Sequence, residues 1–232
     1  MSGRSPRGGR GVAGAPERED GRAARARGTR ARIVAAATGL FTSTGYTVTS
    51  IGAIAAAAGV GEQTVYYAFG TKKAVLAAAL DRAVAGDDEP RPTLERPWAL
   101  DALADPDPYG QLRRQVAGAG DIYLRAAALL DVVRSAATTD PDLAEVWSAN
   151  IRQRLAVQRV FVEALARKTP LPQGLTAEEA ADVAMALLSP ETYNLLVRER
   201  GWEHARWQEW AVTALTGLLT TLPAVPPPPP AD

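Results

Sequence analysis

Apolar residues recur at helical spacing along most of this chain, and no segment alternates with the period of two that marks a half-buried strand. The first helical pattern starts at Thr29 and stops at Gly45, a residue type that often ends helices. Its apolar positions fall on one face: Ile33, Ala37, Leu40 and Phe41. These patterns predict an all-α protein.

Two short helices joined by a glycine-containing turn follow. Thr49 or Ser50 is the expected N-cap of the first, which runs to Ala58. Gly59 ends it, and we expect a positive φ there, because glycine adopts that backbone conformation at little cost. The second covers 63–69, and a third capped by Thr71 extends to about residue 84. Two short helices joined in this way form a helix-turn-helix, which places its second helix in a DNA groove.

A boundary is predicted at residues 86–108, where five prolines leave room for few regular elements. Beyond it the spacing is helical again, although Gly118 and Gly120 are expected to bend or break the first long helix. Asp140 and Pro141 then open a helix of more than 25 residues. A capping box, Thr176 with Glu179, opens the next. Pro190 should kink that helix, and the last helix is expected from about 203 to 221.

The predicted organisation has four parts. They are a disordered basic arm (1–28), a helix-turn-helix domain (29–80), a larger helical domain for ligand binding and dimerisation (81–222) and a Pro-rich disordered tail (223–232).

Composition excludes several functional classes. The chain of 232 residues is 47% hydrophobic and has no cysteine, so disulfides and thiolate metal sites are impossible. No run of about 18 apolar residues predicts a membrane span, and no apolar run follows the N-terminal arginines as in a secretory signal. We therefore expect a cytoplasmic protein without membrane partners. The one histidine, His204, and the lack of a phosphate-binding loop favour neither an enzyme, nor a cofactor, nor a metal site.

The net charge of zero conceals an asymmetry. Residues 1–32 carry nine arginines and three acidic residues, and residues 33–232 carry the compensating negative excess. Arginine clusters attract DNA phosphates through their long-range field and through counterion release. For residues 1–20 we favour a solvated tail. The five arginines between 22 and 32, including Arg30, lie next to the helix-turn-helix, and there we expect DNA contact.

The helix at 63–69 carries side chains suited to DNA. Gln63 and Thr64 lie at its start, the end that enters the major groove, and glutamine can pair with an adenine edge. Tyr66 and Tyr67 lie next to the inward pair Val65 and Phe69, and a phenol can donate to phosphate. Lysines at 72 and 73 oppose the dipole of their own helix, which is reasonable if they face phosphates.

Residues 29–80 resemble the DNA-binding domain of TetR-type transcriptional regulators. The matching positions are Thr49, Ile54-Ala55, Gly59-Val60, Thr64, Tyr66, Phe69 and Thr71-Lys72. Residues 186–202 also resemble the penultimate helix of one TetR branch. The resemblance implies an all-helical homodimer that binds a DNA palindrome and is released by a small molecule.

The same resemblance implies roles for single residues. Thr49, Tyr66 and Lys72 match phosphate contacts, and four others match positions that face bases or backbone: Gly61, Glu62, Gln63 and Tyr67. The chain departs from the family where Gly52 and Ala53 replace a common charged residue, where Glu62 is acidic, and where Ala68 replaces a frequent histidine. These departures leave few base-reading groups, so the operator sequence is not predicted.

The C-terminal half suggests an effector pocket and a dimer interface. Large apolar and polar residues spread over several helices are candidate pocket residues: Trp98, Tyr109, Tyr123, Asp131, Trp147, Asn150 and Tyr193. Asp131, within an apolar run, needs a partner, which could be Arg134, Arg125 or a cationic ligand. The last two helices carry more apolar surface than internal packing requires, so we expect the homodimer there. The alternative function is a helical small-molecule-binding or scaffold protein with a degenerate DNA-binding domain.

Overall fold

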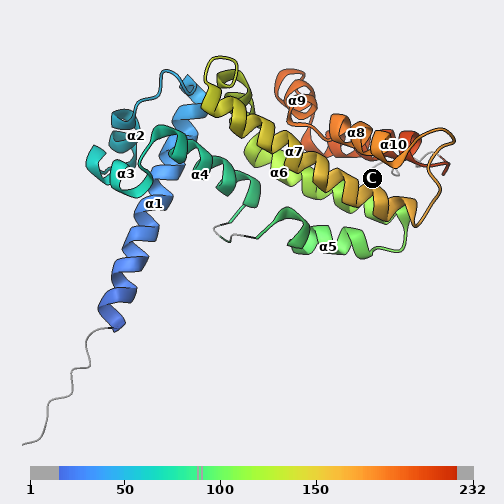
Figure 1. Ribbon diagram of the computed structural model, residues 1–232, viewed down its shortest axis with the longest axis horizontal. Helices are drawn as coiled ribbons and strands as arrows, with labels where there is room; N and C mark the ends of the chain where they lie inside the picture. The colour runs from blue at the N-terminus through green and yellow to red at the C-terminus, as the bar shows by residue number, and fades with distance from the viewer. Residues whose placement is uncertain (1–15, 88, 90, 224–232) are drawn as a thin grey trace, which may run out of the picture.

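The structure, a computed structural model, describes residues 16–87, 89 and 91–223. Throughout these residues the regular elements are helices and no strand occurs, which confirms the all-α prediction (Figure 1). No helix among them is both long and apolar enough to cross a membrane. The first part of the basic arm, 1–15, and the end of the Pro-rich tail, 224–232, lie outside the described residues.

The N-terminal unit consists of four helices, α1 (Pro16–Thr44), α2 (Ile51–Ala58), α3 (Glu62–Phe69) and α4 (Lys72–Ala85). Its core is formed by apolar residues that α1 to α4 turn inward, among them Ile33, Phe41, Ile54, Val65 and Val75. Helix α1 extends far beyond this core, as Figure 1 shows. We expected the helix only from Thr29. It begins earlier because residues 22–27 read RAARAR, and both residue types favour helices.

The caps of the short helices follow the sequence closely. Ser50 caps α2 by accepting from the Ala53 backbone N–H (3.1 Å), so of the two expected candidates Ser50 has this role. Gly59 ends α2 with φ 65°, the expected left-handed conformation. Thr71 caps α4 by accepting from the Ala74 N–H. Each cap satisfies a backbone group that the end of a helix leaves unpaired.

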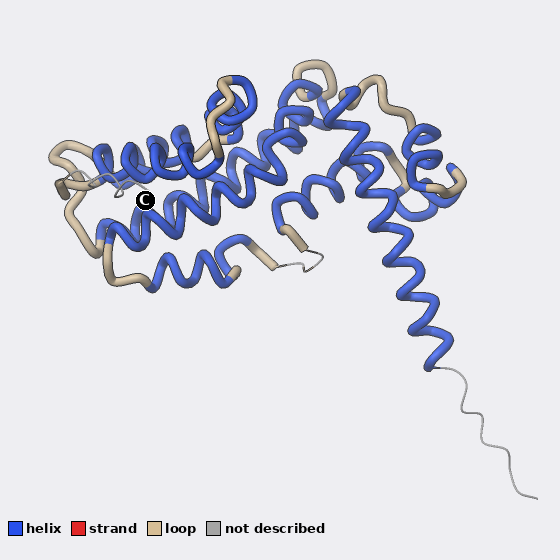
Figure 2. Tube along the Cα trace, turned by 180° about the vertical axis from the view of Figure 1, so that it is seen from behind, coloured by secondary structure: helices blue, strands red, loops and turns tan. Residues whose placement is uncertain are grey.

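The C-terminal unit is a layered bundle in which α6 and α7 run side by side (Figure 2). Its elements are η1 (Thr93–Glu95), α5 (Pro97–Ala104), α6 (Pro108–Ala136), α7 (Pro141–Ala166), α8 (Ala177–Leu187), α9 (Pro190–Tyr193), the π-helical η2 (Asn194–Glu199) and α10 (His204–Leu219). Helices α5 and α10 both pack on α6, which is therefore the central element of the unit.

Three sequence expectations about this unit were wrong. The Pro-rich region contains α5, because Pro97 occupies the first helical position, where a missing N–H costs nothing. Gly118 does not break α6: a Cβ there would lie 2.1 Å from the Trp98 ring, so the glycine permits the close approach of α5. Pro190 does not kink a continuous helix either, since α8 ends at Leu187 and Pro190 opens α9 behind the N-cap Ser189.

Candidate nucleic-acid interface and effector pocket

Helix α3 separates an inward face from a highly exposed outer face. Val65 is fully buried, whereas the side chains of Tyr66 and Tyr67 are 52% and 94% exposed. The polar residues at the start of the helix, Glu62, Gln63 and Thr64, are also exposed. Two exposed tyrosines side by side are unusual on a surface without a partner. The structure therefore brings the predicted groups of α3 together on one surface.

The N-terminus of α3 is open to solvent. Gly61 is its N-cap and, having no side chain, makes no side-chain hydrogen bond to the first turn. Free backbone N–H groups and the positive end of the helix dipole form a site that suits a phosphate oxygen. The side chain of Glu62, in this first turn, lies against Gly52 of α2.

Arg30 holds the other end of α3. Its guanidinium donates to the backbone carbonyl of Ala68 and lies 4.1 Å from the centre of the Phe69 ring. A cation at a helix C-terminus is favourable because the last carbonyls lack intrahelical partners. In this structure Arg30 therefore positions α3.

Lys72 and Thr49 are directed into the protein. The Lys72 ammonium donates to the carbonyls of Tyr46 (2.8 Å) and Thr49 (2.9 Å) and lies 4.3 Å from the centre of the Tyr46 ring. Thr49 is buried, and its hydroxyl donates to the carbonyl of Gly45 at 2.7 Å. Both side chains hold the loop that leads into α2.

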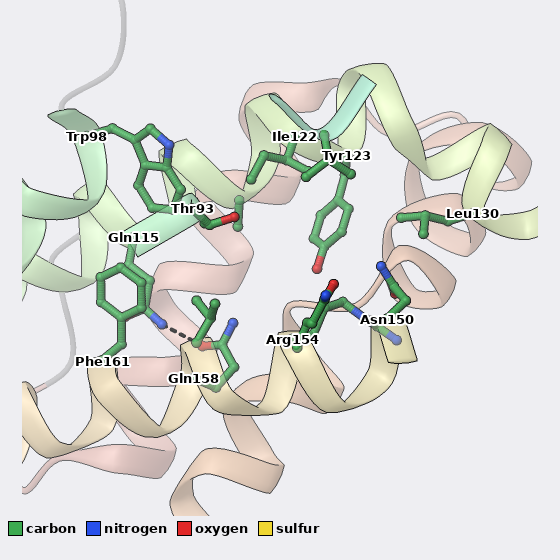
Figure 3. A pocket seen from close by; sticks show the side chains of 14 residues that line it. Thr93, Trp98, Gln115, Ile122, Tyr123, Leu130, Asn150, Arg154, Gln158 and Phe161 are labelled. Atoms are coloured by element: carbon green, nitrogen blue, oxygen red, sulfur yellow. Dashed lines mark hydrogen bonds between the residues drawn. The ribbon is translucent and has the colours of Figure 1, made fainter. Parts of the chain in front are cut away.

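A cavity of about 110 Å³ lies between the end of α4, η1, α5, α6 and α7 (Figure 3). Three of the residues predicted for a pocket line it: Trp98, Tyr123 and Asn150. The Trp98 ring stacks on Phe161, with centroids 6.0 Å apart. Burial raises the pKa of the Tyr123 phenol, whose hydroxyl donates to the carbonyl of Leu188 at 2.5 Å.

Four other candidates lie outside this cavity. Tyr109 donates to the carbonyl of Pro223, and Trp147 packs beside Arg154. Tyr193 contacts the Tyr123 ring from behind, with centroids 5.8 Å apart. Asp131 is half-exposed and forms an ion pair with Arg134 (2.8 Å), so among the partners considered for it, the structure selects Arg134.

Sequence reasoning missed five polar residues of the cavity, Thr93, Gln115, Gln153, Arg154 and Gln158. Gln115 of α6 donates to Gln158 of α7 at 2.7 Å, and both are buried. Arg154 lines the wall one turn after Asn150, with its Nε and Nη1 atoms buried and without hydrogen-bond partners. The spacing was the available signal: 150, 154 and 158 fall on one face of a helix at intervals of four.

Comparison with known proteins finds the TetR family in the segment where the sequence analysis found the resemblance. Residues 33–79 match the family model of bacterial regulatory proteins of the TetR family. No curated protein matches the sequence of this chain.

Solved structures share the fold over most of the chain. The complex of SmeT with triclosan is 19% identical, with a TM-score of 0.66 over 88% of this chain and 99% of that one; SmeT is the repressor of a Stenotrophomonas maltophilia multidrug efflux pump. NalD, the secondary repressor of a Pseudomonas aeruginosa efflux pump, is 19% identical (TM-score 0.62, 85% and 98%). A TetR-family regulator from Mesorhizobium loti is 24% identical (TM-score 0.61, 83% and 96%).

The family match runs from within α1 to within α4, and the solved structures share the helical architecture over most of the chain. The exposed face of α3 and the cavity lie at opposite ends of α4. Residues 33–79 thus match the TetR family of bacterial regulatory proteins, within a helical fold that this chain shares with solved regulators of that family.

Proposed function

We propose that this protein is a ligand-responsive transcriptional repressor that binds a palindromic operator as a homodimer and is released by a small molecule. The observation that carries the DNA-binding part is the outer face of α3. Tyr67 is 94% exposed there, next to Tyr66, Gln63 and an open helix N-terminus. A helix whose inner face is buried and whose outer face presents donors is suited to a major groove.

The homodimer is proposed through α8 and α10. These helices pack on each other, and their outer faces retain apolar groups, including the half-exposed Leu218 and the partly buried Trp210. A two-fold pairing of such faces would form a four-helix interface and place two α3 helices about 34 Å apart, one turn of DNA.

Helix α4 connects the cavity to the DNA-binding helices. Val84, near its C-terminus, lines the cavity, and Arg125 of α6 donates to the carbonyls of Ala83 (3.0 Å) and Val84 (3.4 Å). At the other end of α4, Lys73 forms an ion pair with Asp142 of α7 (2.8 Å). A ligand that shifts the wall of the cavity would thus move α4, provided that it binds the two conformations with different affinities.

A gel-shift experiment with the upstream region of the protein's own gene tests this function. The expected result is a complex that survives excess random DNA and weakens steeply as salt rises, because phosphate contacts release counterions. The matched comparison is the same fragment with its palindrome scrambled. Equal affinity for both fragments would refute the repressor and favour a ligand-binding or scaffold protein whose DNA-binding domain is degenerate.

A further inference from the structure

Arg154 is the only charged residue among those that line the described cavity. Its Nε and Nη1 atoms are buried without hydrogen-bond partners. The nearest carboxylate oxygen, Oε2 of Glu191, lies 3.8 Å from Nη1, beyond hydrogen-bond distance, on a side chain that is 42% exposed. Trp147 covers another side of the guanidinium, with its ring centre 5.4 Å from Cζ.

The guanidinium therefore has a long ion pair with Glu191 but no hydrogen-bond acceptor at Nε or Nη1. A guanidinium does not lose its proton in proteins, so burial cannot neutralise it. Unpaired buried donors are unfavourable, and the planar donor pattern of arginine matches the two oxygens of a carboxylate. The Oδ1 atom of Asn150, one turn earlier on α7, is also buried without a partner. Tyr123 points from α6 toward Arg154 across the cavity (Figure 3).

The rest of the cavity is small and mostly apolar, with Thr93, Gln115, Gln153 and Gln158 as its other polar residues. Trp98, Ile122, Leu130, Val157 and Phe161 form its walls. The volume of about 110 Å³ approaches that of a protein cavity known to bind benzene, about 150 Å³. The cavity is thus close to the size of one aromatic ring, and it adjoins a wider groove with which it shares Val84, Thr93, Asn150, Gln153 and Val157.

We propose that the effector is a small aromatic monocarboxylate, whose carboxylate pairs with Arg154 and whose ring occupies the space between Trp98 and Leu130. This inference rests on the proposed function, because it assigns a ligand class to the effector site. The proposed ligand is an anion, in contrast to the cationic ligand considered for Asp131. The Asp131 carboxylate forms an ion pair with Arg134 and does not line the cavity.

Direct binding of simple ring compounds to the full chain tests the proposal. Benzoate, benzamide and benzamidinium have nearly the same shape and differ in charge. Calorimetry should show one benzoate bound per chain and no binding of benzamidinium. Benzamide should bind about tenfold more weakly or worse, because a charge-assisted hydrogen bond becomes a neutral one. Absence of benzoate binding, or benzamide and benzoate of equal affinity, would overturn it.

Two variants locate the charge that is responsible. Arg154→Gln removes the guanidinium, and Asn150→Asp is isosteric and supplies an internal carboxylate at i,i+4 spacing. Each should lower benzoate affinity at least tenfold while circular dichroism remains that of the wild type. Arg152→Gln makes the same chemical change at an exposed position of α7 and should leave benzoate affinity unchanged. Wild-type benzoate affinity in both cavity variants would contradict the proposal. If one variant does not fold, the comparison of benzoate, benzamide and benzamidinium on the wild-type protein still tests it.

The two proposals fail in different ways. If the protein binds benzoate but forms no specific DNA complex, the repressor function is refuted and the carboxylate site is supported. If it forms a specific DNA complex but does not bind benzoate, the repressor function is supported and the carboxylate site is refuted.

Discussion

The carboxylate of Glu62, the first residue of α3, lies against the backbone of Gly52 in α2. A Cβ at position 52 would be 2.6 Å from Oε1 of Glu62. Gly52 and Glu62 both depart from the TetR-type pattern that this segment resembles. In the structure these two residues lie next to each other. The missing side chain at 52 leaves room for the acidic group beside α2.

Gly52→Ala should displace Glu62 without unfolding the domain. The obstructing atom is the end of a flexible side chain, and alanine favours a helix over glycine by about 1 kcal/mol. The thermal midpoint should therefore stay equal or rise, whereas DNA affinity should fall because the carboxylate turns toward the phosphates. Thermal unfolding and gel shifts measure the two effects.

The double variant Gly52→Ala/Glu62→Gln serves as the control for that experiment. Removing the charge should restore most of the DNA affinity that the alanine costs. If the affinity of the double variant remains as low as that of Gly52→Ala, the charge of Glu62 is not the cause.

Gln63 and Tyr66 should affect DNA binding differently. Tyr66→Phe removes a phenol proposed to contact phosphate and should weaken specific and random DNA alike. Gln63→Ala should relax the preference at one base position by about 1–3 kcal/mol if the pair is bidentate. A set of single-base operator variants, titrated with both proteins, measures this. Equal losses on specific and random DNA for both variants would exclude Gln63 from base reading.

The sequence predicted the helices better than their contacts, for a physical reason. Caps such as Thr71 and Thr176 act on residues three positions away, so a local pattern contains the information. Arg30 and Ala68 are 38 residues apart, and their hydrogen bond depends on how α1 crosses α3. The same limit applies to Arg154, because its place in the cavity wall and its distance from Glu191 depend on how separate helices pack.

Gly118→Ala should destabilise the C-terminal unit. The added Cβ would lie 2.1 Å from a ring atom of Trp98, which is stacked on Phe161 and cannot move without disturbing α5. We expect a loss of about 1–3 kcal/mol in the free energy of unfolding, as for other overpacked sites, and a red-shifted tryptophan emission. Gly39→Ala is the matched control, because its Cβ meets nothing within 4 Å. Destabilisation of the control to the same extent would contradict the role assigned to Trp98.

Glu179 should make stability depend on pH through the capping box of α8. Hydrogen bonds from the Thr176 backbone N–H and hydroxyl hold the pKa of Glu179 below its usual 4.5. A depressed folded-state pKa means that this stabilisation is complete above the unfolded-state pKa and is lost as pH falls through the folded-state value. Melting curves should therefore separate wild type from Glu179→Gln at pH 7, and the gap should close as pH falls below 4.5 and through the folded-state pKa. A gap that stays constant over this range would rule out titration of Glu179 as its source.

Arg125 should couple ligand binding to DNA release. Its guanidinium is held by the last carbonyls of α4, Ala83 and Val84, while Val84 also lines the cavity. Arg125→Met keeps most of the aliphatic stem and removes these hydrogen bonds, so α4 should follow the cavity wall less closely. We expect benzoate to bind Arg125→Met about as well as wild type, but to release DNA only at several-fold higher concentration. Arg113→Met, an exposed position on the same helix whose ion pair is with Asp107, should leave both values unchanged. Release of DNA by Arg125→Met at the wild-type ligand concentration would show that the coupling runs through other contacts of α4, such as the Lys73–Asp142 ion pair.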